Sequence, residues 1–115
     1  MKLSRKAVTL LRKVKRHILA EPKRIAMRVW RIEKRGIANR SVLKIPSCGT
    51  VACIGGWVEV LSKTTKEAWD ILGLAGAQQA ELFFDYKLQR APRQQTPAHA
   101  RAVADHIDRF IEKYT

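Results

Sequence analysis

The chain has 115 residues, of which 46% are hydrophobic and 29% charged, a composition typical of one globular domain with a modest core. Its formal net charge of +13 is confined to residues 1–44, where 15 Lys and Arg face two Glu, while the remaining residues are balanced. Few Gly and Pro argue against a many-turned β fold, and no apolar run is long enough to cross a bilayer. The sequence therefore predicts one all-α domain, residues 1–115, of about five to six helices, cytoplasmic and not membrane-bound.

The first predicted helix follows from apolar residues at three- and four-residue spacing, with basic residues on the opposite side of the helix. Glu21-Pro22 ends it, because Pro suits the first position of a new helix and disfavours the interior of an old one. A second helix is predicted from Pro22 to about Lys34, so that residues 3–35 form a basic helical hairpin. The apolar stripe of the first helix comprises Leu3, Ala7, Leu10, Leu11, Val14 and Ile18.

Four arginines of the second predicted helix recur at i, i+4, i+7 and i+11, forming a ladder roughly 16 Å long at about 1.5 Å per residue. Like charges on one helix face repel by a few tenths of a kcal/mol per pair, which bound phosphates would offset. The ladder consists of Arg24, Arg28, Arg31 and Arg35. Together with Arg5, Arg12, Lys13 and Arg16 of the first helix, these are the predicted nucleic-acid-binding residues.

After a loop over 36–47, a motif-bearing core helix is predicted at 50–61, capped by Thr50 or Ser47 and apolar almost all round. An αα-hairpin is predicted at 65–84, its first helix opened by a capping box of Thr64 with Glu67 and ended at Gly73. Its second helix covers about 77–84.

Residues 86–95 are predicted to form a polar loop. Thr96-Pro97 then gives an N-cap and first-turn pair for a closing helix over 97–113. The core stripe of this last helix comprises Ala100, Val103, Ala104, Ile107, Phe110 and Ile111.

The segment Thr65–Phe84 has some likeness to a DNA-binding helix-turn-helix. Two positions depart from that motif, since Trp69 stands where a small residue is wanted and Gln79 where a buried aliphatic is wanted. The segment is also poor in charge. An ordinary αα-hairpin is the favoured interpretation.

Cys48 and Cys53 admit two chemical hypotheses besides a buried structural role, which is favoured. A zinc site would need further ligands from His17, His99 and His106, of which the last two lie about 10 Å apart in rise on one helix. A nucleophilic thiol at Cys48, ahead of a helix N-terminus and with a His downstream, is the other hypothesis. A disulfide is disfavoured in a cytosolic chain.

Three further alternatives concern the basic N-terminal region. Membrane binding by the first helix would suit its basic face, but the apolar face lacks interfacial Trp or Phe. Its amphipathic, acid-poor start also fits a mitochondrial presequence, although its periodicity is that of a core helix. Trp30 beside the arginine ladder could stack on a base of a single strand, but such a residue is more often part of a core.

Two segments together resemble a family of small, uncharacterised bacterial and phage proteins. They are E-P-K-R-I-A-M-R-V-W at Glu21–Trp30 and C-G-T-V-A-C-I-G-G-W at Cys48–Trp57. The resemblance extends from about Val14 to Ile111 and lends no catalytic residues. It implies a structural or binding unit formed by Cys48, Gly49, Thr50, Cys53, Gly56 and Trp57. The strong basic charge departs from the family's usual composition and indicates a specialisation of this protein.

The sequence therefore predicts a small basic protein, without catalytic residues, metal or cofactor, that binds nucleic acid (DNA or RNA) through its phosphates. The resemblance suggests a phage or mobile-element factor. A module or inhibitor that docks on an acidic host protein is the first alternative, because such a surface is also a polyanion. A thiol or zinc site built on Cys48 and Cys53 is the second.

Overall fold

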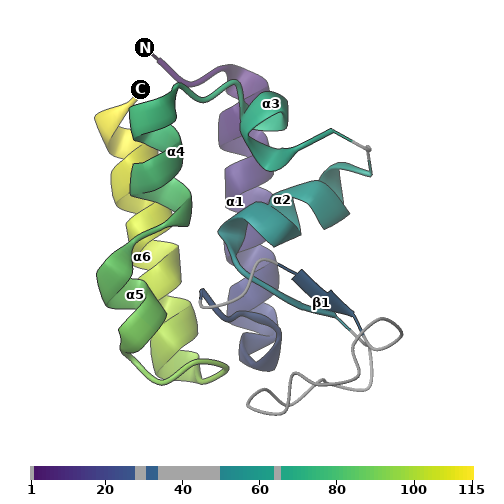
Figure 1. Cartoon of the computed structure of the whole chain (residues 1–115), viewed down its shortest axis with the longest axis vertical. Coiled ribbons are helices and arrows are strands. Elements are labelled where there is room, and N and C mark those ends of the chain that lie inside the picture. The colour runs from purple at the N-terminus through teal and green to yellow at the C-terminus, as the bar shows by residue number, and fades with distance from the viewer. Residues whose placement is uncertain (1, 28–30, 34–49, 64–65) are drawn as a thin grey trace.

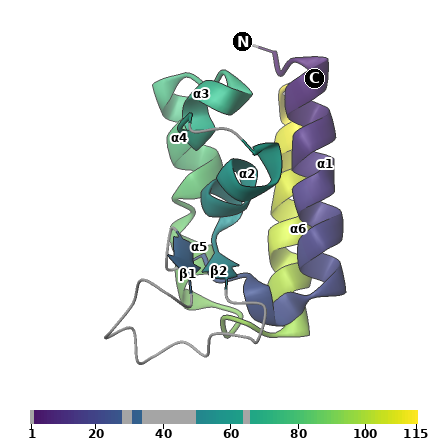
Figure 2. The same cartoon turned by 90° about the vertical axis from the view of Figure 1, so that its right-hand side faces the viewer.

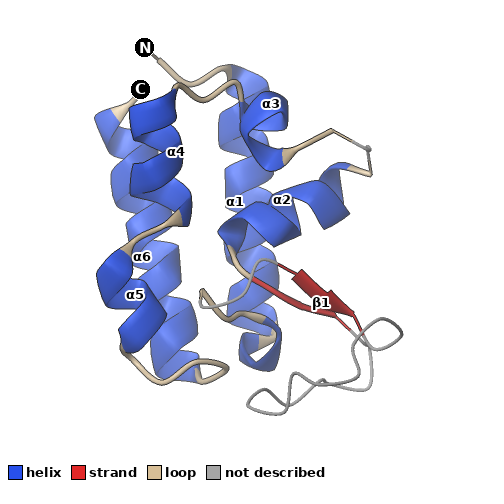
Figure 3. Cartoon of the chain, in the orientation of Figure 1, coloured by secondary structure: helices blue, strands red, loops and turns tan. Residues whose placement is uncertain are grey.

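The computed structural model describes residues 2–27, 31–33, 50–63 and 66–115 (Figure 1). The predicted all-α fold class is confirmed, since helices dominate a single compact domain and the described strands form only a small two-stranded ribbon (Figure 3). The described helices are α1 (Arg5–Ala20), α2 (Ile54–Ser62), α3 (Ala68–Leu72), α4 (Gly76–Phe83), α5 (Tyr86–Arg90) and α6 (Pro97–Lys113), with a 3-10 turn η1 (Pro22–Arg24) and strands β1 (Arg31–Glu33) and β2 (Thr50–Ala52).

The first and last helices, α1 and α6, lie side by side along the long axis of the molecule (Figures 1 and 2). They run in opposite directions, so the start of α1 meets the end of α6. There the backbone N–H of Leu3 donates to the carbonyl of Tyr114 at 2.8 Å. Ser4 caps α1, its hydroxyl accepting the N–H of Ala7 at 3.1 Å. The buried residues of α1 are Ala7, Leu11, Val14 and Ile18, as the apolar spacing predicts.

The predicted second helix is wrong. Among the described residues of this segment, the 3-10 turn at Pro22–Arg24 alone is helical, after which Ile25 forms a parallel bridge with Ala52. Further along, β1 pairs antiparallel with β2, with Ile32 opposite Val51. The basic helical hairpin over 3–35 is therefore absent, and so is the helical arginine ladder.

The reason for the extended course lies in burial on every side. The consecutive residues Ile25, Ala26 and Met27 are all buried, which a helix packed by one face cannot achieve. Their backbone groups find partners on other elements: Ala26 N–H donates to the carbonyl of Ala52 at 3.1 Å, and Gln95 N–H donates to that of Ile25 at 3.1 Å. Local helix propensity takes no account of partners on distant elements, so the sequence pattern alone favours a helix.

The core helix α2 begins at Ile54, four residues later than predicted. The prediction that Thr50 caps it is wrong, because Thr50 belongs to β2 and the N-cap is Cys53. The backbone of Thr50–Ala52 is used for pairing with β1 and so cannot start the helix. The alternative cap Ser47 and the predicted loop over 36–47 lie outside the described residues.

The predicted αα-hairpin is observed as α3 and α4. Gly73 ends α3 with a positive φ of 68°, a left-handed conformation that glycine adopts without strain. The predicted capping box differs, since Thr64 lies outside the described residues and Glu67 is itself the N-cap. Glu59 of α2 instead accepts the N–H of Ala68 through its Oε2 at 3.0 Å.

The predicted polar loop over 86–95 is wrong at its start, because Tyr86–Arg90 forms the short helix α5. Asp85 caps it by accepting the N–H of Leu88 at 3.0 Å, and Leu88 is buried. The closing helix α6 has the predicted bounds, and Thr96 accepts the N–H of His99 at 3.2 Å as the predicted N-cap. Its buried residues include the whole predicted stripe.

Candidate nucleic-acid interface

The outward side of α1 carries a group of exposed cations. Counting 100° per residue, the five of them that belong to the helix lie on the arc opposite its buried stripe, whereas Lys2 precedes the N-cap Ser4; α1 itself contains no Asp or Glu. None of them forms an ion pair with a carboxylate in the described part of the chain. We call this surface the α1 cationic face; it consists of Lys2, Arg5, Lys6, Arg12, Lys13 and Arg16.

The α1 cationic face lowers the stability of its own helix. Arg5 and Lys6 occupy the first turn, where the positive end of the helix dipole makes a cation unfavourable by about 0.3–1 kcal/mol. Arg12 and Arg16 lie four residues apart and repel each other by a few tenths of a kcal/mol. The stability of α1 therefore does not account for the placement of these charges.

The α1 cationic face ends where α1 meets α6. Lys15 lies at this boundary and is paired with Asp108, with 2.7 Å between Nζ and Oδ2. Beyond it the exposed charges are balanced, since the outer side of α6 alternates basic and acidic residues. These residues are Arg101, Asp105, Asp108, Arg109, Glu112 and Lys113. The excess charge of the described surface therefore belongs to α1.

The structure places Arg24 apart from the α1 cationic face and among protein partners. Its guanidinium lies 4.7 Å from the centroid of the Trp57 ring and 3.0 Å from the carboxylate of Glu21, and its side chain is 15% exposed. Arg31 belongs to β1, while Arg28 and Arg35 lie outside the described residues. Sequence reasoning thus found four of the six cations of the α1 face. It left Lys2 and Lys6 out of the predicted site, although Lys6 falls on the same helical side.

The second segment of the family resemblance is Cys48–Trp57. Its described residues, from Thr50 to Trp57, run from β2 directly into α2. Gly56 and Trp57 are buried in α2, and the ring of Trp57 lies 4.4 Å from that of His17. The described members therefore join α1, η1 and α2, while Cys48 and Gly49 lie outside the described residues.

Cys53 is enclosed at the N-terminus of α2 and is 2% exposed. Burial raises the pKa of its thiol to about 11, which opposes thiolate formation at neutral pH. The proposed histidine partners lie elsewhere in the core: Nε2 of His99 accepts the N–H of Met27, and Nε2 of His106 contacts the carbonyl of Glu81. No three His, Cys, Asp or Glu residues of the described ranges are grouped as metal ligands.

The α3–α4 hairpin carries no basic side chain, since residues 68–84 contain no Lys or Arg. The helix-turn-helix alternative therefore gains no support from it. Trp30, the candidate for base stacking, lies outside the described residues. Among the helices that the structure describes, none combines the length and apolar character that spanning a bilayer requires.

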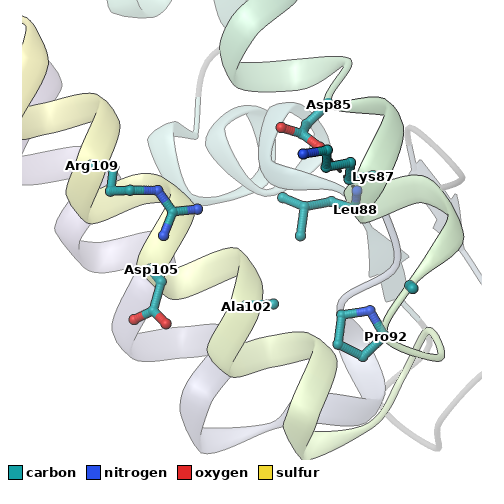
Figure 4. Close-up of a pocket in the computed structure, with 8 residues that line it drawn as sticks. Asp85, Lys87, Leu88, Pro92, Ala102, Asp105 and Arg109 are labelled. Carbon is teal, nitrogen blue, oxygen red and sulfur yellow. Dashed lines mark hydrogen bonds between the residues drawn. The ribbon is translucent and has the colours of Figure 1, made fainter.

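A cleft of about 290 Å³ lies between α5 and α6, away from α1 (Figure 4). Leu88 and Pro92 provide its apolar wall, and Arg109 extends from α6 toward Leu88. Its charged lining is balanced, with two carboxylates and two cations, so it favours neither sign of ligand. Its lining residues are Asp85, Lys87, Leu88, Ala91, Pro92, Ala102, Asp105 and Arg109.

Comparison with protein families, with curated proteins and with solved structures found no match to this chain. The resemblance to bacterial and phage proteins therefore stays a prediction.

Proposed function

We propose that this protein binds nucleic acid through contacts between its α1 cationic face and the phosphate backbone. The observation that carries the proposal is the set of five exposed cations on one side of α1, with Lys2 just ahead of the helix; none of the six has an ion-pair partner in the described part of the chain. A surface kept only for solubility has no need of cations in the first turn of a helix, where they are unfavourable.

Binding of this kind is electrostatic and largely independent of sequence. Each phosphate that a Lys or Arg neutralises releases condensed counterions, so the affinity falls steeply as salt is added. Phosphate contacts fix the position of a protein on the nucleic acid, whereas contacts to base edges specify sequence. We therefore expect high tolerance of sequence and a strong dependence on ionic strength.

The test is the binding of a fluorescently labelled 20-base-pair DNA duplex, measured by anisotropy between about 50 and 200 mM salt. Six phosphate contacts would give a slope of log affinity against log salt of about −5. Charge reversal of Arg12 and Arg16 to Glu should lower the affinity at least tenfold. Absence of binding to DNA and RNA at the lower salt concentration would refute the proposal.

An acidic protein is the other polyanion that the α1 cationic face could accept. Phosphates are favoured because Arg5, Arg12 and Arg16 extend along a line of about 16 Å, and a nucleic-acid backbone carries negative charge along its whole length. The two partners are separated by co-purification with and without nuclease treatment. A partner protein that survives nuclease and is lost in the Arg12→Glu/Arg16→Glu variant would support the acidic protein, provided that the duplex shows no binding.

The phage or mobile-element origin is part of the same proposal and is supported by the resemblance of the two motifs. The motif residues from Cys48 to Trp57 have no place in phosphate binding under this proposal. For the described members, burial of Cys53 and Trp57 supports a packing role.

A further inference from the structure

The five cations of the α1 cationic face that lie on the helix itself form two rows. At about 100° per residue, Arg5, Arg12 and Arg16 fall within an arc of about 40°, and Lys6 and Lys13 lie within about 20° of each other. The centres of these two groups are separated by about 90° around the helix axis. We call them the arginine row and the lysine row.

The strip of α1 surface between the two rows does not project far into solvent. The exposed residues there include Thr9 and Ala20, whose side chains are short. Thr9 does not project its hydroxyl as a donor to solvent, because Oγ1 donates to the carbonyl of Arg5 at 2.9 Å. The longer Arg and Lys side chains therefore lie on either side of this strip and extend beyond it.

The described part of this side of the molecule has no aromatic platform. α1 contains no Phe, Tyr or Trp, and the exposed large aromatics of the described residues are Phe84 and Tyr86. Both adjoin the junction of α4 and α5, which lies across the molecule from α1 with α6 between them (Figures 1 and 2). Proteins that bind single strands combine a basic groove with aromatic side chains on which the bases stack.

We propose that the nucleic acid is a B-form DNA duplex and that α1 lies along its major groove, with the arginine row against one phosphate backbone and the lysine row against the other. This inference rests on the proposed function. The groove, about 12 Å wide, admits an α-helix of about 10–12 Å diameter. A single strand offers one backbone and would engage one row. Duplex RNA has a deep, narrow major groove that does not admit a helix in this way.

The experiment compares three labelled probes with the full chain under the same salt conditions. They are a 20-base-pair DNA duplex of mixed sequence, one strand of that duplex, and the RNA duplex of the same sequence. We expect the DNA duplex to bind at least tenfold more tightly than either of the others. Equal or tighter binding of the single strand or of the RNA duplex would overturn the inference and leave nucleic-acid binding intact.

Three double variants with the same loss of charge test the two rows. Arg5→Gln/Arg12→Gln weakens the arginine row and Lys6→Gln/Lys13→Gln weakens the lysine row. The control is Lys87→Gln/Arg90→Gln on α5, on the far side of the molecule (Figure 2). All of the altered side chains are exposed, so the fold should be retained, and circular dichroism checks this point.

Each row variant should reduce the magnitude of the salt slope on the DNA duplex by about 2, because two phosphate contacts are lost. The control should leave the slope unchanged. If one row alone contributes, the two-backbone geometry is wrong. If the control loses as much as the row variants, binding is spread over the whole surface and the inference is wrong. If none of the three probes binds the unmodified protein, the proposed function itself fails.

Discussion

Trp57 and Arg24 are joined twice, through the backbone of one and the side chains of both. The indole Nε1–H of Trp57 donates to the carbonyl of Arg24 at 2.8 Å, and the guanidinium of Arg24 lies 4.7 Å from the centroid of the same ring. The ring of Trp57 also lies 4.4 Å from that of His17 of α1. One side chain of α2 therefore fixes both the end of α1 and the turn that follows it.

The first prediction concerns this contact. Trp57→Phe removes the indole N–H and leaves the Arg24 carbonyl without that donor, which should lower the free energy of unfolding by about 1–3 kcal/mol. Urea denaturation followed by circular dichroism measures the change. Tyr86→Phe is the control, because its hydroxyl contact with Arg90 is exposed and should contribute less than about 0.5 kcal/mol. Equal effects of the two substitutions would show that the contact between Trp57 and Arg24 does not stabilise the fold.

The second prediction is that one substitution raises the stability of the protein and weakens its binding to DNA. Lys6→Glu replaces an unfavourable cation by a favourable anion in the first turn of α1, and should raise the free energy of unfolding by about 0.5–1 kcal/mol. The same substitution should weaken DNA binding at least severalfold.

Lys13→Glu is the matched control, since it makes the same change in charge away from the helix end. It should weaken binding comparably but alter stability by less than about 0.5 kcal/mol. Urea denaturation and duplex anisotropy on the same samples give both quantities. A Lys6→Glu variant that is more stable and binds as well as the unmodified protein would remove the first turn of α1 from the interface.

The third prediction is a loss of stability in mild acid. His99 is fully buried on α6 and its Nε2 accepts the N–H of Met27 at 3.4 Å. Burial lowers its pKa from 6.5 to about 4, partly opposed by the backbone of Pro92. Between these two pKa values the unfolded chain binds more protons than the folded one, so the free energy of unfolding falls as the pH falls.

The contribution of His99 should be fully present above pH 6.5 and should decline by about 2 kcal/mol between pH 7 and pH 5. The pKa of His17 is also lowered, mainly by burial and then by Arg24, and acts in the same direction. Chemical denaturation at several pH values measures the slope. In His99→Gln the slope over this range should be shallower, and an identical slope in the variant would assign the acid sensitivity to other groups.

The fourth prediction tests the thiol alternative. In a Cys48→Ser variant, Cys53 should resist a thiol reagent such as DTNB at pH 8, because it is buried and its pKa is raised to about 11. Unfolding in urea should then expose one reactive thiol per chain, which provides the internal control. Rapid labelling of the native variant would show an accessible, activated Cys53 and would revive a chemical role for it.

The parts of the fold that sequence predicted well are those whose signals are local. The amphipathic stripes of α1 and α6 and the N-cap at Thr96 depend on residues within one helix. The polar side of α1, which holds most of the candidate interface, follows from the same periodicity. For that reason Arg5, Arg12, Lys13 and Arg16 were identified from spacing alone.

The parts that sequence missed depend on distant partners. Ile25, Ala26 and Met27 form an apolar run that fits a helix equally well, and only contacts with β2 and α6 decide for an extended chain. The predicted arginine ladder is wrong for the same reason, because its spacing requires residues 22–35 to be helical. The helix α5 was missed for a different reason: a five-residue helix shows little periodicity, and its signal reduces to the cap at Asp85.

The extended segment after η1 also constrains the order in which the chain can fold. The N–H of Ala26 donates to the carbonyl of Ala52, the N–H of Gln95 donates to the carbonyl of Ile25, and the N–H of Met27 donates to Nε2 of His99, 72 residues further along. Contacts of such long separation form only after a large loop has closed, which slows folding. During synthesis the α1 segment therefore emerges, with its apolar stripe uncovered and its cations exposed, long before α6 is available to cover it. Under the proposed function, nucleic acid that binds α1 at that stage would bind a partly folded chain. It would therefore affect how this protein reaches its native state.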